Sequence, residues 1–215
     1  MMSNGFIKLV IKMKSLSEIE TVVKRASKAT GYSWGEAEEI SKCVRLLELF
    51  NLPGIKHLNE YYKEREKNKF ENLNLFKENN LPTINTFCPL ILGISFLDQI
   101  KILENNKTIE FSNVAYPILF LSFLSRSSEI IGKKIQIQID QNEILLNLNM
   151  NIYSNFISLE FPKIANRLQV KFHENKDNFS EDDWKSLYKL SEKTFVDETD
   201  SLKKGAAGAG LTDND

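Results

Sequence analysis

The sequence contains few of the residues from which small stapled or metal-bound folds are built. It has two cysteines, Cys43 and Cys88, and two histidines, His57 and His173, with no Cys-x-x-Cys pair. Disulfide scaffolds and Cys/His zinc sites need more of these residues, so we expect neither. A chain with so few cysteines is typical of a reducing compartment, and we expect a cytoplasmic protein.

Long hydrophobic runs and an excess of charge of one sign are also missing. The longest apolar stretch, 114–124, falls well short of the roughly 20 residues that span a bilayer. Residues 1–14 lack the apolar core and cleavage site of a signal peptide and alternate as a strand does. Lys and Arg total 28 against 29 Asp and Glu. We therefore expect neither a membrane nor a nucleic acid as a partner.

The overall composition, 42% hydrophobic and 27% charged, is that of an ordinary globular protein. The first part of the chain is predicted to be helical. The capping sequences Ser15–Glu18 and Ser33–Glu36 each precede apolar residues at helical spacing, which predicts two helices. Gly31 suits the left-handed residue that follows the first of them. A third helix is expected over 55–65, followed by a solvated extension and linker to residue 80.

From residue 81 the pattern changes to short segments that predict strands around a buried helix. We expect a buried segment over 88–97, paired strands over 100–103 and 108–111, a buried helix over 117–131, strands over 134–139, 144–148, 152–159 and 168–172, and a last helix after Ser180. Because helices and strands are segregated, the fold class is α+β, an N-terminal helical layer packed on a C-terminal antiparallel sheet with one buried helix.

This organisation predicts a single domain followed by a short tail. The domain covers 1–204, of which 1–80 is mainly helical and 81–204 is sheet-rich with the final helix. The tail, 205–215, is rich in Gly and Ala and ends in acidic residues.

The corner between the first two helices, Gly31-Tyr-Ser-Trp-Gly35, matches the Gly-x-Ser-x-Gly pattern of serine hydrolases. That pattern needs a buried strand before the serine, whereas a helix end precedes Ser33, so helix capping by Ser33 and Glu36 is the better interpretation. Tyr32 and Trp34 are positioned to pack or to line a cleft. Cys88 has no basic neighbour in the sequence, so we interpret it as a buried structural thiol and not a nucleophile.

Carboxylates at two places are candidate metal ligands. Glu36 and Glu39 lie one helical turn apart, but acids in a first turn are also explained by the helix dipole. In the tail, Thr212, Asp213, Asp215 and the terminal carboxylate offer hard oxygens to a divalent cation, the alternative being a frayed terminus. We expect the tail to dock, with Leu211 as an apolar anchor and Asp213 and Asp215 reaching a cation or Arg126.

Two blocks carry a resemblance to a known family. The block 31–39 (GYSWGEAEE), with 15–20 before it, and the terminal block 208–215 (GAGLTDND) resemble an uncharacterised bacterial family catalogued as a domain of unknown function. The resemblance implies no activity. It starts near Met13, so we expect the protein to start at either Met1 or Met13.

The sequence leaves two hypotheses for function. The first is a cytoplasmic binding or accessory subunit of a small-molecule metabolic enzyme, associated with a larger enzyme subunit or with further copies of itself. The second is an enzyme acting on a small polar metabolite, with a site formed by Tyr32, Ser33, Trp34, Glu36 and Glu39 together with the tail acids, with or without a divalent cation.

Overall fold

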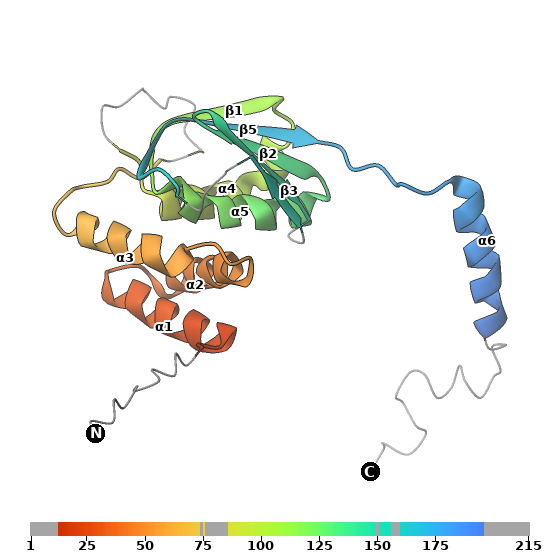
Figure 1. The fold of residues 1–215 in the computed structure, drawn as a ribbon, viewed down its shortest axis with the longest axis horizontal. Helices are drawn as coiled ribbons and strands as arrows, with labels where there is room; N and C mark the ends of the chain where they lie inside the picture. Colours follow the sequence, from red (N-terminus) through yellow and green to blue (C-terminus); the bar gives the residue numbers. More distant parts are fainter. Residues whose placement is uncertain (1–12, 74, 76–85, 149–150, 156–159, 196–215) are drawn as a thin grey trace, which may run out of the picture. The chain divides into compact units, whose positions relative to one another are not determined.

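The computed structural model describes residues 13–73, 75, 86–148, 151–155 and 160–195. The chain divides into two units, 1–175 and 176–215, which are described separately (Figure 1). Most of the strand predicted over 1–14, and all of the tail 205–215, lie outside the described residues. The predicted domain boundary after residue 204 stays a prediction.

Three helices begin the first unit: α1 (Leu16–Ala29), α2 (Trp34–Leu49) and α3 (Gly54–Arg65). The hydroxyl of Ser15 accepts a hydrogen bond from the Glu18 amide and caps α1. Gly31 follows α1 with a φ of 101°, the left-handed conformation that glycine adopts without strain. The three helices predicted for this part of the sequence are confirmed, and serine caps mark the starts of α1 and α2.

The segment after residue 88 forms a helix, α4 (Pro89–Leu103), which corrects the strand predicted over 100–103. Pro89 occupies the first helical position, where its missing N–H is not needed, and the Cys88 thiol accepts from the Ile91 amide at 3.5 Å. Residues such as Leu90, Leu92, Phe96 and Ile100 are buried on several sides of α4. A helix buried on several sides lacks an amphipathic repeat, so a short apolar run within it resembles a strand.

The other helix of the core, α5 (Pro117–Ile131), is confirmed as the buried helix and packs against α4 at a glycine. A Cβ added at Gly93 of α4 would overlap the ring of Phe123 of α5. Gly93 therefore permits the close approach predicted from the sequence.

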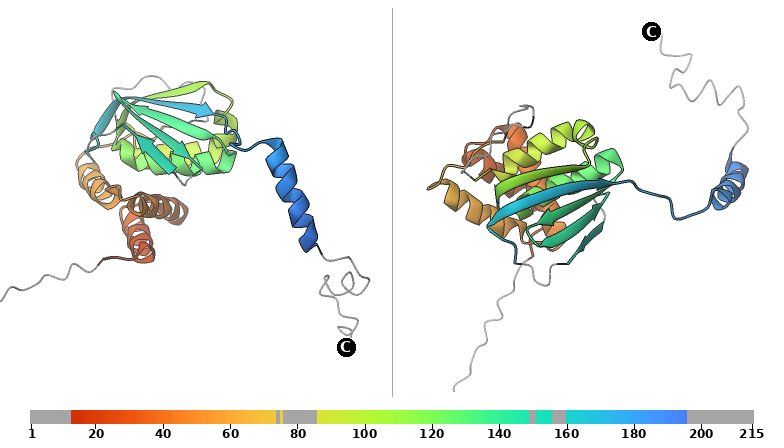
Figure 2. Two further views of the ribbon diagram at one scale, coloured as in Figure 1. Left: turned by 45° about the vertical axis from the view of Figure 1, so that its right-hand side comes forward. Right: turned by 90° about the horizontal axis from the view of Figure 1, so that it is seen from above.

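The sheet contains β1 (Thr108–Ala115), β2 (Lys134–Ile139), β3 (Asn142–Asn147), β4 (Asn151–Ser154) and β5 (Ile164–His173) in the order β1-β5-β2-β3-β4, every neighbouring pair antiparallel. On β2, Ile135, Ile137 and Ile139 are fully buried while the residues between them are half-buried. In Figures 1 and 2, α4 and α5 cover one face of the sheet, and α1–α3 lie beyond these two helices. The α+β class is confirmed, with two buried helices against the sheet where one was predicted.

The second unit contains α6 (Glu181–Ser191) and the short 3₁₀ turn η1 (Glu192–Thr194). Ser180 and Asp183 form a reciprocal capping box that starts α6, as predicted. No residue of α6 is buried. Among the described residues, no helix is long and apolar enough to cross a membrane.

Candidate functional site

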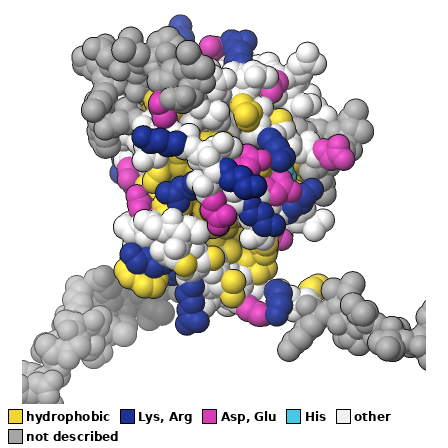
Figure 3. All heavy atoms as spheres, turned by 90° about the vertical axis from the view of Figure 1, so that its left-hand side faces the viewer, with side chains coloured by type: hydrophobic (Ala, Val, Ile, Leu, Met, Phe, Trp, Pro, Cys, Tyr) yellow, Lys and Arg dark blue, Asp and Glu magenta, His cyan; other side chains and the backbone are white. Residues whose placement is uncertain are grey.

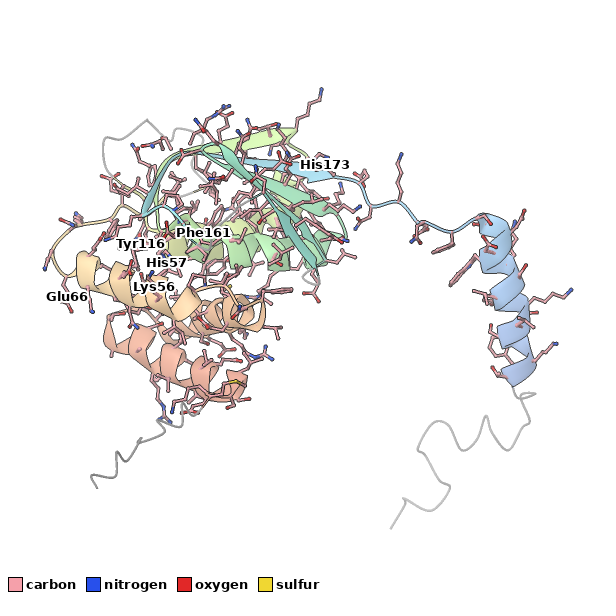
Figure 4. The ribbon with its side chains drawn as sticks, in the orientation of Figure 1. Lys56, His57, Glu66, Tyr116, Phe161 and His173 are labelled. Carbon is pink, nitrogen blue, oxygen red and sulfur yellow. The ribbon has the colours of Figure 1, made fainter. Side chains whose placement is uncertain are left out.

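The α1–α2 corner contains the Gly-x-Ser-x-Gly sequence, and here Ser33 acts as a helix cap. Its hydroxyl accepts from the Glu36 amide at 3.2 Å, and the Glu36 carboxylate accepts from the Ser33 amide at 2.7 Å. His173 lies on β5 and contacts Gln136 at 2.7 Å, at the far end of the sheet from α1 and α2 (Figure 4). His173 is therefore not placed to act as a base for Ser33.

Trp34, the other aromatic residue predicted at the corner, lies on the surface. Its side chain is 58% exposed, and the Lys28 ammonium lies 5.6 Å from the centre of its ring. Trp34 is therefore not part of an enclosed site with Tyr32.

Glu39 and Arg126, predicted separately as site residues, form an ion pair with each other. The carboxylate lies 2.6 Å from Arg126 and 2.9 Å from Lys42. Burial acts to raise the pKa of Glu39, but hydrogen bonds and charge from Lys42 and Arg126 outweigh it and lower the pKa. Arg126 also donates to the Cys43 thiol at 3.5 Å. Glu39 is thus bound to two cations and joins α2 to α5.

Metal ligands do not cluster within the part of the chain that the structure describes. No group of three or more His, Cys, Asp or Glu side chains is placed to hold an ion there. Glu36 is used in the cap and Glu39 in its ion pairs. The tail residues Leu211, Thr212, Asp213 and Asp215 lie outside the described residues.

Tyr32 belongs instead to a buried polar cluster, formed with Tyr61 of α3 and Cys88 at the start of α4. The Tyr61 hydroxyl donates to the Cys88 thiol at 2.9 Å, and the Tyr32 hydroxyl lies 3.4 Å from the Tyr61 hydroxyl. All three side chains are at least 97% buried. Burial raises the pKa of both Tyr32 and Tyr61 far above the ordinary tyrosine value, and the nearby Cys88 raises it further. Both phenols therefore stay protonated and act as hydrogen-bond donors.

Arg65, the last residue of α3, lies over this cluster. Its guanidinium is 4.4 Å from the centre of the Tyr32 ring, and it donates to the Thr30 carbonyl at 2.9 Å. The stack and the hydrogen bond hold Arg65 against the α1–α2 corner. A cation is thereby fixed beside the buried thiol and phenols.

A pocket opens at this point between the end of α3 and the start of α4. Its volume is about 440 Å³, and it is lined by Tyr61, Arg65, Glu66, Lys67, Asn68, Lys69, Phe70, Asn72 and Cys88. Three of the lining side chains are cations and one is a carboxylate. Figure 4 labels Glu66 at the end of α3, and Figure 3 shows that side of the molecule, where Lys and Arg side chains lie among acidic and apolar ones. We call these nine residues the polar pocket.

Aromatic side chains surround His57 on α3. His57 is 4% exposed, and its Nδ1 atom has no hydrogen-bond partner among the described residues. Its ring meets Tyr116 and Phe161 edge to face, with centres 5.9 Å and 6.3 Å away, and Figure 4 shows the three side chains together. Burial lowers the pKa of His57. The charges of Lys56 and Lys163 lower it further, and the charge of Glu60 raises it by less than these effects lower it. His57 is therefore a neutral side chain at neutral pH.

Sequence reasoning found Tyr32, which contacts Tyr61, but missed the polar pocket itself. Tyr61 and Cys88 are far apart in the sequence, and neither belongs to a motif. One signal was present: arginine is rare in this lysine-rich chain, and Arg65 is one of only five. A scarce arginine is a candidate for a position that needs a planar guanidinium, which Arg65 occupies.

Comparison with known proteins gives one match. Residues 14–84 match a family described as protein of unknown function (DUF3726). The resemblance to an uncharacterised family predicted from the block at 31–39 is therefore confirmed. Comparison with curated proteins and with solved structures gives no match. The matched residues include α1–α3 and the 65–72 side of the polar pocket.

Proposed function

We propose that this protein binds a small anionic metabolite in the polar pocket. The observation that carries the proposal is the lining of the pocket, where Arg65, Lys67 and Lys69 outnumber the single carboxylate of Glu66. The pocket's volume of about 440 Å³ lies within the roughly 300 to 1,000 Å³ of small-molecule sites.

The start of α4 adds to the attraction for an anion. Cys88 is both the N-cap of this 15-residue helix and part of the pocket lining. The first turn of a helix carries a partial positive charge, which favours bound anions. The Ile91 amide is already bonded to the Cys88 thiol and Pro89 has no N–H, so we count only this charge and no free amide toward the attraction. The pocket cations and the helix N-terminus therefore act on the same pocket.

Tyr61 and Cys88 favour a ligand with hydrogen-bonding groups in addition to its charge. The phenol and the thiol lie at the buried end of the pocket and already form a hydrogen bond with each other. Their positions are fixed by the packing of Tyr61 against Phe70, with ring centres 5.1 Å apart. A carboxylate or phosphate bound near the cations would therefore place the rest of a small polar molecule against this pair.

The binding role agrees better with an accessory subunit of a metabolic enzyme than with an enzyme. The residues first considered for catalysis have structural partners: Ser33 and Glu36 form the cap, and Glu39 binds Lys42 and Arg126. The metal-assisted alternative depends on Asp213 and Asp215 and stays a prediction. Two buried free thiols, Cys43 and Cys88, support a reducing location such as the cytoplasm.

The test is to identify what the purified full-length protein retains. Small molecules released by denaturation would be measured by mass spectrometry for the wild type, for Lys67→Gln/Lys69→Gln, and for Lys101→Gln. Lys101 is an exposed lysine at the opposite end of α4 and serves as the matched control.

We expect an anionic compound that is retained by the wild type and the control and is lost from the double variant. The same compound should raise the thermal midpoint of the wild type by mass action. Equal retention by all three proteins would contradict the proposed site, and turnover of the compound by the isolated protein would favour the enzyme.

A further inference from the structure

The helix α6 presents an apolar face that the described residues of its own unit, 176–195, leave exposed. Trp184, Leu187 and Tyr188 follow at helical spacing and are 52%, 63% and 52% exposed. Phe179, just before the helix, stacks on Trp184 with ring centres 5.8 Å apart and extends this face. A contiguous aromatic and aliphatic face of this kind is typical of an interaction surface.

The length of α6 gives a physical reason for a partner. It has 11 residues, whereas isolated helices shorter than about 12 to 15 residues are marginal in water. The capping box at Ser180 and Asp183 adds only local stability. Burial of the apolar face against a partner would supply the stability that the isolated helix lacks, because most helical stability in proteins comes from packing.

The charges of α6 indicate which partner fits. Its first turn carries Glu181, Asp182 and Asp183, and Lys185, one turn later, pairs with Glu181 at 3.9 Å. Its last turn carries Lys189, and η1 adds Glu192 and Lys193. The start of the helix therefore has an excess of negative charge and the end an excess of positive charge, on a helix with one apolar face. A second α6 running antiparallel would bring each acidic end to the other's basic end, and the two helix dipoles would also oppose each other.

We propose that α6 pairs antiparallel with α6 of a second copy of the chain and so forms a homodimer. The two apolar faces around Trp184 and Leu187 bury each other, and the charged ends fix the direction. A parallel pair would place the acidic ends together, which costs energy. An anionic membrane surface would also be repelled by the acidic turn.

The test uses charge exchange in the full-length protein, with mass in solution measured by light scattering during size-exclusion chromatography. One variant is Glu181→Lys/Asp182→Lys, which keeps Asp183 for the cap. The other is Lys189→Glu/Lys193→Glu. Lys176→Glu, outside the helix, is the control.

We expect twice the chain mass for the wild type and the control, and the mass of one chain for each charge variant alone. An equimolar mixture of the two charge variants should return to twice the chain mass as a heterodimer. This recovery separates pairing from simple loss of the helix, which mixing would not repair.

Three outcomes would rule out pairing through α6. They are a monomeric wild type, a dimer that persists in Trp184→Ala/Leu187→Ala, and a mixture that stays monomeric. Pairing of the Glu181→Lys/Asp182→Lys variant with the wild type in preference to the other variant would show a parallel arrangement, and it too would contradict the antiparallel pair.

Discussion

Gly93 is the described glycine at which an added Cβ would overlap its neighbours most, because it packs directly against the Phe123 ring of α5. We expect Gly93→Ala to lower the free energy of unfolding by about 1 to 3 kcal/mol, since the methyl group must displace the buried Phe123 ring. Urea denaturation measures the change. Gly35→Ala is the matched control, because a Cβ at Gly35 meets nothing within 4 Å. Equal stability of the two variants would contradict the close approach.

His57 makes stability depend on pH in a definite direction. Burial lowers the pKa of His57 in the folded protein below the value of about 6.5 that the unfolded chain retains. Above this value both states are neutral and His57 contributes nothing. As the pH falls through about 6.5, the unfolded chain takes up the proton first, so the folded state loses stability.

We therefore expect the unfolding free energy of the wild type to decrease between about pH 7.5 and pH 5, with the pH slope reduced in His57→Phe. Urea titrations at several pH values measure these slopes even where a variant is less stable overall. An unchanged slope in His57→Phe would show that another group titrates.

At the scale of elements, a substitution at the start of α2 can distinguish a capping role of Ser33 from a catalytic one. We expect Ser33→Ala to destabilise the protein by about 1 kcal/mol, the usual effect of losing a cap. Retention of the anionic ligand should be unaffected, because Ser33 does not line the polar pocket. Denaturation and ligand retention measured on one preparation test both statements, and loss of binding without loss of stability would contradict them.

The elements also show what the sequence can and cannot predict. Helices with a serine cap and one apolar face, such as α1 and α2, were predicted because both signals are local. The end of α4 was wrongly predicted as a strand, since residues such as Ile100 are buried within a helix that has apolar residues on several sides. Its N-cap is a cysteine, which is not among the residues that usually signal a helix start.

At the scale of the whole molecule, the candidate site depends on contacts between segments that are distant in the sequence. Tyr32 was predicted because it lies in a recognisable corner, but its partners Tyr61 and Cys88 follow 29 and 56 residues later. Only the packing of α3 and α4 against the corner brings them together. Arg126 and Glu39 were both predicted as site residues, yet their mutual ion pair across α2 and α5 became visible only in the fold.

The central claim, that the polar pocket holds a small anion, is tested most directly by locating the bound anion. Isotope-labelled full-length protein would be titrated with inorganic phosphate and, separately, with succinate, while backbone amide resonances are followed. We predict saturable shifts confined to residues 65–72 and the first turn of α4, absent in Lys67→Gln/Lys69→Gln and preserved in Lys101→Gln. Shifts spread over the lysine-rich surface, or shifts equal in both variants, would contradict the account.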